Sequence, residues 1–402
     1  MIRIEMTREK LLGCLVGLLV LVMASCEGLS KKEQALLKKI EEVRQEFAPD
    51  KRTALFDVRV FTDSKKYILK GETDNEGALV KLRETLTESG FDFTDEIEVL
   101  PSEALDGLTQ AVVNLSVANL RSNPKHSAEL ATQATLGTPV KVLKQDGGWY
   151  YIQTPDKYLS WVDDGGIEPM DKTTFDRWQG AKKIIFTQTY GHSFADEGRN
   201  QVVSDLVAGN ILELTGTTGD YFQVAYPDGR KALVAMAEAQ PYDEWLEGLD
   251  PSPENLVATS KELMGVPYLW GGTSTKGMDC SGFTKTVYFL NGMVIPRDAS
   301  QQVHTGKPVD SVQDFDRLER GDLLFFGKKA TDSTAEKVVH VGMWIGNNEF
   351  IHASDRVRIS SMDPDADNYD AFNHKRYLRS KRILKEKDEG LISLADNPLF
   401  KD

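Results

Sequence analysis

The chain has 402 residues, of which 27% are charged and 40% hydrophobic, with 32 Gly, 15 Pro and 3 Cys. This composition excludes disordered, collagen-like and disulfide-scaffold proteins. The length predicts two to four domains, because single hydrophobic cores stop growing near ~250 residues. The 48 Lys and Arg against 62 Asp and Glu give a net charge of −14, which argues against a nucleic-acid partner.

An export signal is predicted at the N-terminus. Residues 1–10 carry basic side chains, and the run Leu11–Ser25 that follows has no charge and is short for a membrane-spanning helix of ~20 residues. The segment Met23–Cys26 resembles a bacterial lipoprotein box, in which the cysteine becomes the lipidated first residue. We therefore expect residues 1–25 to be a signal peptide and Cys26 to carry a lipid anchor. An ordinary signal peptide and a single anchor helix are the alternatives.

Cysteine usage singles out one thiol. Cys14 lies inside the predicted signal and Cys26 at the predicted lipidation site, so Cys280 is left without a partner for an internal disulfide. A lone thiol in an exported chain is either chemically useful or a small buried hydrophobic residue, and the count alone leaves both open.

The next segments predict a tether and a small αβ module. Residues 26–50 are charged with a weak helical pattern, and are interpreted as a tether or a short helix. Residues 51–109 predict a ββαβ unit from alternating and helical apolar spacing. The expected elements are strands at 54–60, 66–71 and 97–100 and a helix around 78–86. The pattern resembles a BON-type module, a fold linked to attachment at the cell envelope.

The segment from 110 to 247 is rich in predicted strands and contains an internal repeat at an offset of 72 residues (209 − 137). The repeated positions are Gly137, Gly147, Pro155, Asp156 and Val162, which recur as Gly209, Gly219, Pro227, Asp228 and Val234. Two copies of one small β unit explain this pattern. Residues 110–168 resemble a bacterial SH3-like barrel, and 169–247 are interpreted as a more divergent second copy.

The last predicted domain, 248–402, begins after a linker rich in proline and acidic residues. Ser252 and Pro253 are typical of an N-cap and a first helical position. Farther on, Phe283, Val287 and Leu290 follow Cys280 at helical spacing, which places the cysteine in the first turn of a helix. Unpaired N–H groups there favour an anion, and a cysteine pKa can fall from ~8.5 into the range ~3.5–7.5. Cys280 is therefore a candidate nucleophile.

A nucleophilic thiol needs a base and a group that orients the base. His340 and His352 lie 12 residues apart (352 − 340) in two strand-like runs, with Asn347 and Asn348 supplying the turn of a hairpin. Two histidines on paired strands can share one face, the first reaching the thiol and the second holding the first ring. Taken singly, each histidine is more often a structural or surface residue.

Residues 250–360 resemble the NlpC-type papain-like cell-wall peptidases. The matching motifs, in order along the chain, are PYLWGG, DCSGF, IPRDASQQ, GDLLFF and HVGMWIG. The resemblance implies a multidomain α+β protein whose papain-like catalytic domain follows two small SH3-like β-barrels and the BON-like module. It also implies Cys280 as nucleophile, His340 as general base and acid, and His352 as the orienting residue. By the same resemblance, the oxyanion is held by the Cys280 N–H and a group of Tyr268.

The order of two SH3-like domains and an NlpC-type domain resembles γ-D-glutamyl-L-diamino acid endopeptidases, which cleave murein stem peptides that have a free N-terminal L-alanine. The resemblance implies a substrate site of five residues: Tyr158, Tyr268, Trp270, Asp279 and Ser281. For each there is a structural alternative: a helix cap for Asp279, core aromatics for Tyr268 and Trp270, and barrel surface for Tyr158.

One position departs from the family pattern. Asn123 stands where relatives tend to have an acidic residue, which weakens the predicted amine site, and the nearby Glu129 is a candidate to compensate.

We therefore predict a monomeric, exported, lipid-anchored cysteine peptidase that acts on free murein peptides in the periplasm or at the cell surface. No metal or phosphate-binding motif is present, so no cofactor is expected. The alternatives are an amidase or acyl transferase on the same fold, and a non-catalytic peptidoglycan-binding lipoprotein.

Overall fold

The computed structural model describes residues 30–63 and 66–396 of the chain. Contacts divide the chain into two compact units, residues 1–100 and 101–402. The predicted signal peptide and Cys26 lie outside the described residues. Among the helices that are described, none is long and apolar enough to cross a membrane.

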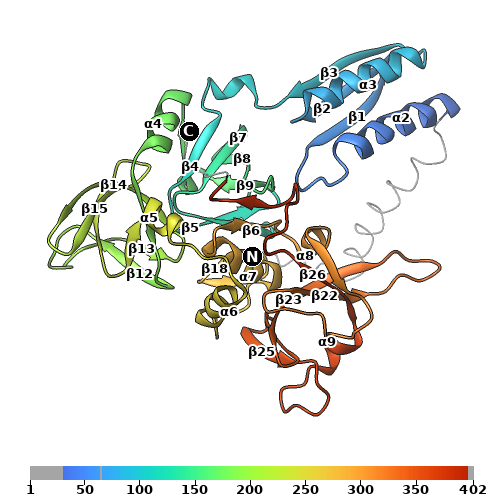
Figure 1. The fold of residues 1–402 in the computed structure, drawn as a ribbon. Coiled ribbons are helices and arrows are strands. Elements are labelled where there is room, and N and C mark those ends of the chain that lie inside the picture. The colour runs from blue at the N-terminus through green and yellow to red at the C-terminus, as the bar shows by residue number, and fades with distance from the viewer. Residues whose placement is uncertain (1–29, 64–65, 397–402) are drawn as a thin grey trace, which may run out of the picture. The chain divides into compact units, whose positions relative to one another are not determined.

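The first unit is a three-stranded sheet with two helices (Figure 1). Its elements are α2 (Lys31–Phe47), β1 (Phe56–Asp63), β2 (Lys66–Thr73), α3 (Glu76–Glu88) and β3 (Phe93–Val99). The strand order is β1-β2-β3, with β1 antiparallel and β3 parallel to β2. The predicted ββαβ order is confirmed, since α3 is the crossover that a parallel pair requires.

The segment interpreted as a tether or a short helix forms a helix, and a longer one than expected. Helix α2 spans 17 residues and begins with a capping box, in which Ser30 and Glu33 satisfy each other's backbone N–H groups. Its apolar stripe of Leu36, Ile40 and Val43 is buried in the core of the first unit. The tether is thus structural from residue 31 onward, because burial of this stripe stabilises the helix. The expected end of the module at 109 also moves, since Leu105 packs in the core of the next domain.

Two seven-stranded sheets follow, and they have the same topology. The first contains β4 (Gln110–Val113), β5 (Val117–Arg121), β6 (Leu130–Thr135), β7 (Pro139–Asp146), β8 (Trp149–Gln153), β9 (Leu159–Asp163) and β10 (Ile167–Met170). The second contains β11 (Lys183–Phe186), β12 (Tyr190–Phe194), β13 (Val202–Val207), β14 (Ile211–Thr218), β15 (Tyr221–Ala225), β16 (Lys231–Ala235) and β17 (Ala239–Pro241). The strand orders, β10-β4-β7-β8-β9-β5-β6 and β17-β11-β14-β15-β16-β12-β13, correspond strand for strand.

The internal repeat predicted from the sequence is confirmed by these strands. Strands β7 and β14 begin at residues 139 and 211, which preserves the offset of 72 (211 − 139). The repeated glycines have the same backbone role: φ is 83° at Gly137 and 86° at Gly209, a left-handed conformation that side chains with a Cβ rarely adopt. Four short helices accompany the sheets: η1 (Glu103–Leu105) before β4, η2 (Asp164–Gly166) between β9 and β10, α4 (Lys172–Gly180) between the two sheets, and α5 (Tyr242–Glu247) after β17.

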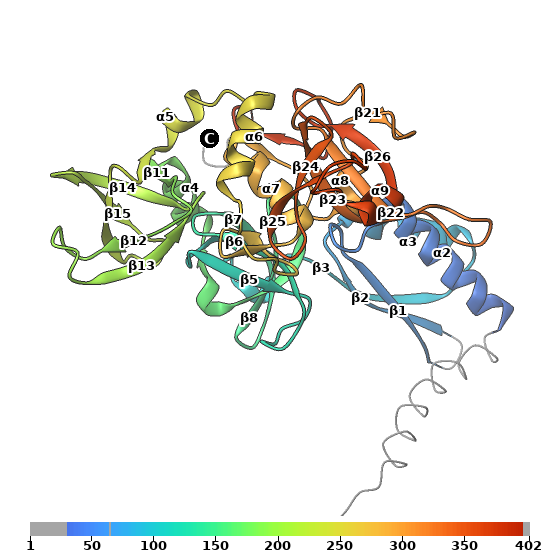
Figure 2. The same cartoon turned by 90° about the horizontal axis from the view of Figure 1, so that it is seen from below.

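The last domain places helix α7 against a six-stranded antiparallel sheet (Figure 2). The sheet order is β21-β26-β22-β23-β24-β25. These strands are β21 (Lys307–Asp310), β22 (Leu323–Lys328), β23 (Lys337–Gly346), β24 (Glu349–Ala353), β25 (Val357–Ser361) and β26 (Tyr377–Arg382). The helices are α6 (Pro253–Glu262), α7 (Cys280–Leu290), α8 (Ala299–Gln302) and α9 (Ala371–Lys375). Two small ribbons complete the domain: β18 (Thr273–Ser274) with β19 (Gly277–Met278), and β20 (Met293–Val294) with β27 (Ile392–Ser393).

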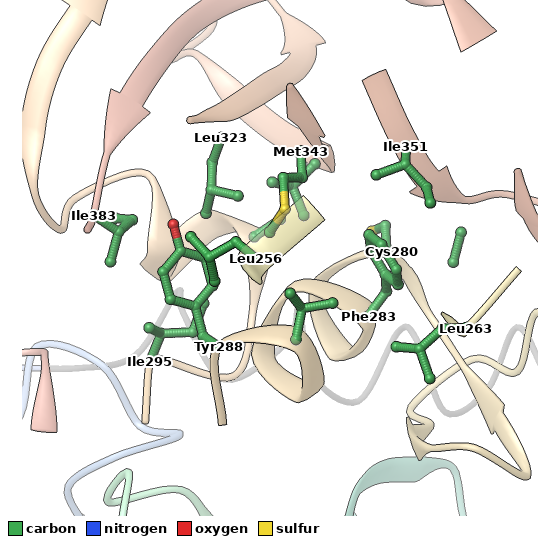
Figure 3. Packing of buried hydrophobic residues seen from close by; sticks show 14 of the residues in the cluster. Leu256, Leu263, Cys280, Phe283, Tyr288, Ile295, Leu323, Met343, Ile351 and Ile383 are labelled. Atoms are coloured by element: carbon green, nitrogen blue, oxygen red, sulfur yellow. The ribbon is translucent and has the colours of Figure 1, made fainter. Parts of the chain in front are cut away.

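Three local predictions in this domain are confirmed. Ser252 caps α6 with Pro253 at its start, and α7 begins at Cys280. The turn between β23 and β24 consists of Asn347 and Asn348, with φ of 53° and 58°, as a type I′ hairpin requires. The apolar core of the domain lies between α7 and the sheet, and Figure 3 shows Cys280 at one edge of it, facing Ile351.

Candidate active site

Cys280 is the first residue of α7 and lies against strand β23. Asp279 caps the helix, its Oδ1 accepting a hydrogen bond from the Gly282 N–H at 2.7 Å. The backbone N–H groups of Ser281 and Val341 also face the sulfur. Since Val341 follows His340 directly, this contact places the thiol next to the candidate base.

The charge state of the thiol differs from the one expected from the sequence. Burial raises the pKa of Cys280 to about 12, and the carboxylate of Asp279 adds to this. The backbone N–H groups and Arg297 act in the opposite direction but do not outweigh burial. The predicted low thiol pKa is therefore wrong for this structure. Cys280 is 7% exposed, and desolvation of its thiolate raises the pKa by more than the helix start lowers it.

His340 and His352 are joined directly. His340 Nε2 lies 2.7 Å from His352 Nδ1, and His352 Nε2 lies 3.1 Å from Ser360 Oγ. One consistent set of tautomers runs through this chain: His340 Nε2–H donates to His352, and His352 Nε2–H donates to Ser360. His340 Nδ1 then has a lone pair with which to take a proton.

Both imidazoles are neutral at physiological pH. Burial lowers the pKa of His352 to about 4, and burial together with His352 lowers that of His340 well below its ordinary value. The resting site thus contains a neutral thiol and a neutral base.

The histidine pair fits because of a glycine on the neighbouring strand. A Cβ at Gly342 would lie 3.2 Å from the Cβ of His352 and 2.7 Å from a ring carbon of Phe350. The Phe350 ring itself packs on His352, with centroids 4.6 Å apart. The glycine in the HVGMWIG motif therefore leaves room for the second histidine to reach the first.

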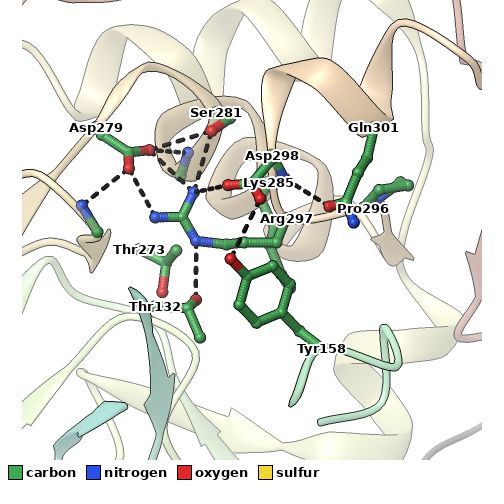
Figure 4. Close-up of polar contacts among 12 residues, drawn as sticks. Thr132, Tyr158, Thr273, Asp279, Ser281, Lys285, Pro296, Arg297, Asp298 and Gln301 are labelled. Carbon is green, nitrogen blue, oxygen red and sulfur yellow. Dashed lines mark hydrogen bonds and ion pairs between the residues drawn. The ribbon is translucent and has the colours of Figure 1, made fainter. Parts of the chain in front are cut away.

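Beside the thiol, Asp279 forms a buried ion pair with Arg297 (Figure 4). Arg297, 1% exposed, donates to both carboxylate oxygens, at 3.1 and 2.7 Å. It also donates to Ser281 Oγ at 3.0 Å and to Thr132 Oγ1 of the first SH3-like domain at 2.9 Å. Asp279 thus caps α7 and is paired with Arg297, and its predicted role in substrate binding stays a prediction.

The first SH3-like domain reaches the same cluster through Tyr158. Its side chain is buried, and its hydroxyl donates to Asp298 Oδ2 at 3.2 Å. A second buried ion pair, Lys285 with Asp156, joins the two domains nearby. Counting Asp279 and Arg297 as well, the cluster has three carboxylates, of Asp156, Asp279 and Asp298, and two cations, of Lys285 and Arg297. Of the three carboxylates, that of Asp298 is the most exposed, at 26%, and it lies 3.9 Å from Arg297.

The two predicted aromatic residues lie on the rim of this site. Tyr268 is half-buried and packs against the core that contains Cys280. Trp270 is 63% exposed, and its indole N–H donates to Glu129 Oε1 of the first SH3-like domain at 2.7 Å. Asn123, by contrast, makes local contacts in the described residues: its side-chain amide donates to Ser122 Oγ, and its carbonyl accepts from the Lys125 N–H.

The structure adds residues that sequence reasoning missed as site residues. These are Arg297, Asp298 and Ser360. The IPRDASQQ motif contains the first two, so a signal for them existed, whereas nothing local marks Ser360. Across the residues described here, no group of three or more His, Cys, Asp or Glu is placed to hold a metal ion.

Comparison with known proteins decides the family. The model of the NlpC/P60 family matches residues 265–376, and that of the bacterial SH3 domain matches 116–168. A γ-D-glutamyl-L-lysine dipeptidyl-peptidase of Bacillus cereus is 30% identical over 244 residues, covering 56% of this chain and 67% of that protein. The chain belongs to the NlpC/P60 family.

Other members support the assignment. Dipeptidyl-peptidase 6 of Lysinibacillus sphaericus is 29% identical over 268 residues, covering 63% of this chain and 92% of that protein. The crystal structure of an NlpC/P60 family protein from Bacillus cereus matches with a TM-score of 0.58 and 25% identity, covering 68% of this chain and 99% of the other. The predicted papain-like catalytic domain with an SH3-like domain is thereby confirmed.

Proposed function

We propose that this chain is a cell-wall cysteine endopeptidase that hydrolyses the γ-D-glutamyl–diamino acid bond of free murein stem peptides. The observation that carries the proposal is the placement of Cys280 at a helix start beside a hydrogen-bonded His340–His352–Ser360 chain. The names of the Bacillus cereus and Lysinibacillus relatives agree with a peptidase of this class.

The reaction begins from the neutral pair. As the sulfur of Cys280 attacks the amide carbonyl, its proton moves to His340 Nδ1, and the imidazolium is stabilised through His352. The tetrahedral intermediate collapses when the leaving amine takes that proton, which leaves a thioester on Cys280. Water then gives a proton to His340 and attacks the thioester, so that the acid product and the free thiol are released.

Donors for the oxyanion are available at the same place. The N–H of Cys280 lies in the first turn of α7, where it has no partner within the helix. Burial raises the pKa of Tyr268 above its ordinary value, and the charges of Cys280 and Asp279 add to this, so its hydroxyl remains a hydrogen-bond donor. Both groups therefore suit the role expected for them, which is to stabilise the negative charge that develops on the carbonyl oxygen.

Selection of a free N-terminal amine is assigned to Asp298 rather than Asp279. Asp279 is held by the bidentate contact of Arg297 and is 9% exposed, whereas Asp298, which accepts from Tyr158 and lies 3.9 Å from Arg297, is 26% exposed and so is the carboxylate that a substrate ammonium can reach. A substrate ammonium restores neutrality there. Tyr158 orients the Asp298 carboxylate, Ser281 orients the groups around it, and Trp270 forms the outer wall of the amine site.

The preference for free peptides rests on contacts that close one end of the cleft. Tyr158 and Glu129 of the first SH3-like domain contact Asp298 and Trp270 of the catalytic domain. If the L-alanine ammonium lies at Asp298, these contacts stand in the way of a polymer strand that continues beyond it, whereas a peptide that ends there avoids them.

The test compares two peptides and two variants. Residues 27–402 are incubated with L-Ala-γ-D-Glu-diaminopimelate and with its N-acetylated form, and released diaminopimelate is measured. We expect release only from the unblocked peptide and none with Cys280→Ala. With Asp298→Asn, the unblocked peptide loses on the order of tenfold or more in kcat/KM, as for a lost charge-assisted hydrogen bond.

Each result has a distinct meaning. Equal cleavage of the blocked peptide retains the peptidase and refutes the amine site. Digestion of intact sacculi as fast as the free peptide refutes the preference for free peptides. No release from either peptide refutes the endopeptidase assignment and favours an amidase or a binding protein.

We further propose that Cys26 carries the lipid anchor, that the second seven-stranded sheet is an SH3-like domain, and that the first unit is a BON-like module. The protein would then be a monomer held at the cell envelope. The shared strand order of the two sheets supports the proposal that the second sheet is an SH3-like domain. Detergent partitioning of the full chain against Cys26→Ala tests the anchor: the variant is expected in the aqueous phase, and unchanged partitioning refutes it.

A further inference from the structure

Two arginines of the catalytic domain flank the histidine pair from the sheet side, and the mechanism above does not use them. We propose that Arg358 and Arg376 together bind a carboxylate of the amino acid that the reaction releases. The inference rests on the proposed function and extends it to the leaving residue.

Arg358 is fixed beside His352 by strand register. It is the direct partner of His352 in the pairing of β24 with β25, so the two side chains share a face of the sheet. Its Nε is buried and has no hydrogen-bond partner within the described part of the chain. The nearest carboxylate oxygen, of Asp355, lies 3.4 Å from that atom, and the side chain remains 40% exposed. Because that Nε is buried and paired with Asp355, a ligand would contact the terminal N–H groups of this partly exposed side chain.

Arg376, the C-cap of α9 directly before β26, approaches the pair from the other side of His340. Its carbonyl accepts from the Gly327 N–H, and the preceding residue, Phe326, is the register partner of His340. Its guanidinium lies 4.2 Å from the ring centroid of Phe372, which is 70% exposed. Its Nε donates to Asn373 Oδ1 at 2.9 Å, which holds the group in place.

The charges of both arginines act on the catalytic groups. Burial lowers the pKa of His340, and the neighbouring His352 adds to this. The charges of Arg376 and Arg358 lower it further, as expected for guanidinium groups close to the imidazole. Burial lowers the pKa of Arg376 itself, and the thiol group of Cys280 is near enough to oppose that change.

The position of the two arginines relative to the acidic cluster around Asp298 indicates the direction in which the substrate binds. The cluster around Asp298 approaches Cys280 from the N-terminus of α7 and contacts the first SH3-like domain. The arginines approach from β25 and from the start of β26. A peptide with its ammonium at the cluster therefore presents the residue after the scissile bond to the arginines. A guanidinium with open terminal N–H groups is well suited to a carboxylate.

The experiment compares L-Ala-γ-D-Glu-diaminopimelate with the same peptide in which the carboxylates of the diaminopimelate residue are amidated. We expect the acid to exceed the amide in kcat/KM by on the order of tenfold or more, as for charge-assisted hydrogen bonds. In the double variant Arg358→Gln/Arg376→Gln, the ratio of kcat/KM for the acid to that for the amide falls to about one, mainly through KM of the acid; this ratio is independent of any change in basal rate caused by the loss of the two charges near His340. Arg356→Gln is the matched control, since Arg356 is 58% exposed and paired with Asp355.

A second measurement separates this inference from the proposed function. Free diaminopimelate and its diamide are titrated into Cys280→Ala protein, with and without the two arginine substitutions. Tighter binding of the acid that is lost in the double variant supports the site even if no peptide is cleaved. Equal cleavage of acid and amide by the unmodified protein, or an acid preference that survives in the double variant, overturns it.

Discussion

Replacing Arg297 by methionine tests the buried cluster, because methionine fills similar space without the charge. Arg297 is 1% exposed and donates to Asp279, Ser281 and Thr132. In the variant, the Asp279 carboxylate keeps the backbone N–H groups of Gly271 and Gly282 and the hydroxyl of Ser281, but no cation. Removing one partner of a buried pair costs about 3–5 kcal/mol, since it leaves an uncompensated buried charge.

We therefore expect Arg297→Met to lower the free energy of unfolding by about 4 kcal/mol, which corresponds to a fall in Tm on the order of 10 °C. The assay is thermal and urea denaturation of residues 27–402, followed by circular dichroism. The double variant Asp279→Asn/Arg297→Met should regain a large part of the loss, because it removes the unpaired charge. Arg356→Met is the control, and at an exposed pair it should cost less than about 1 kcal/mol.

Two outcomes would refute this reasoning. If Arg297→Met is no less stable than Arg356→Met, the cluster is not a desolvated ion pair. If the double variant is less stable than the single one, the loss comes from missing hydrogen bonds and packing, not from an unpaired carboxylate.

The remaining predictions concern the catalytic groups. Because burial raises the pKa of Cys280 to about 12, iodoacetamide should alkylate it at pH 7 more slowly than a free peptide thiol and faster as the pH rises; a faster rate than the free thiol at pH 6 contradicts this. Ser360→Ala removes the acceptor for His352 and should lower kcat about tenfold or more with little change in KM, which steady-state kinetics can check; an unchanged kcat excludes a positioning role. Gly342→Ala should reduce kcat by displacing His352 while Cys280 stays in place. An active variant with the native fold contradicts the steric argument. The pKa of His352 is lowered to about 4 in the folded state, so its contribution to stability is present above ~6.5 and is lost as the pH falls toward 4; Tm between pH 7.5 and 5 should fall less in His352→Gln than in the native protein.

Local patterns in the sequence predicted much of the site. The helix start at Cys280, the Asn347–Asn348 turn and the repeat at an offset of 72 depend on residues that are close together or spaced regularly. Such features follow from backbone preferences and apolar periodicity, so they can be predicted without knowledge of tertiary contacts.

The sequence of helix α2 contains a local helix signal to which the interpretation as a tether or short helix gave too little weight. Ser30 with Glu33 forms a capping box, and Leu36, Ile40 and Val43 repeat at helical spacing. The dense charges around this stripe obscured it, although a solvated polar face is what a helix packed on one side requires.

The roles of Arg297 and Asp298 could not be predicted in this way, because they depend on contacts between distant segments. The partners of Arg297 are Asp279, 18 residues away, and Thr132, 165 residues away. The low thiol pKa was predicted from the helix start alone, and the error came from burial of Cys280, which only the folded core determines.

The contacts of the first SH3-like domain make it part of the active site instead of a separate binding module. A domain that only recruits substrate needs no buried ion pair with the catalytic domain, yet Asp156 is 4% exposed in its pair with Lys285. Thr132 and Tyr158 hold Arg297 and Asp298, the two residues that set the charge next to Cys280. Since unpaired buried charges are strongly unfavourable, separation of the two domains would cost several kcal/mol at these contacts. These contacts fix the first SH3-like domain beside the N-terminus of α7, and under the proposed function it is this domain, not the catalytic residues, that limits the length of substrate on that side.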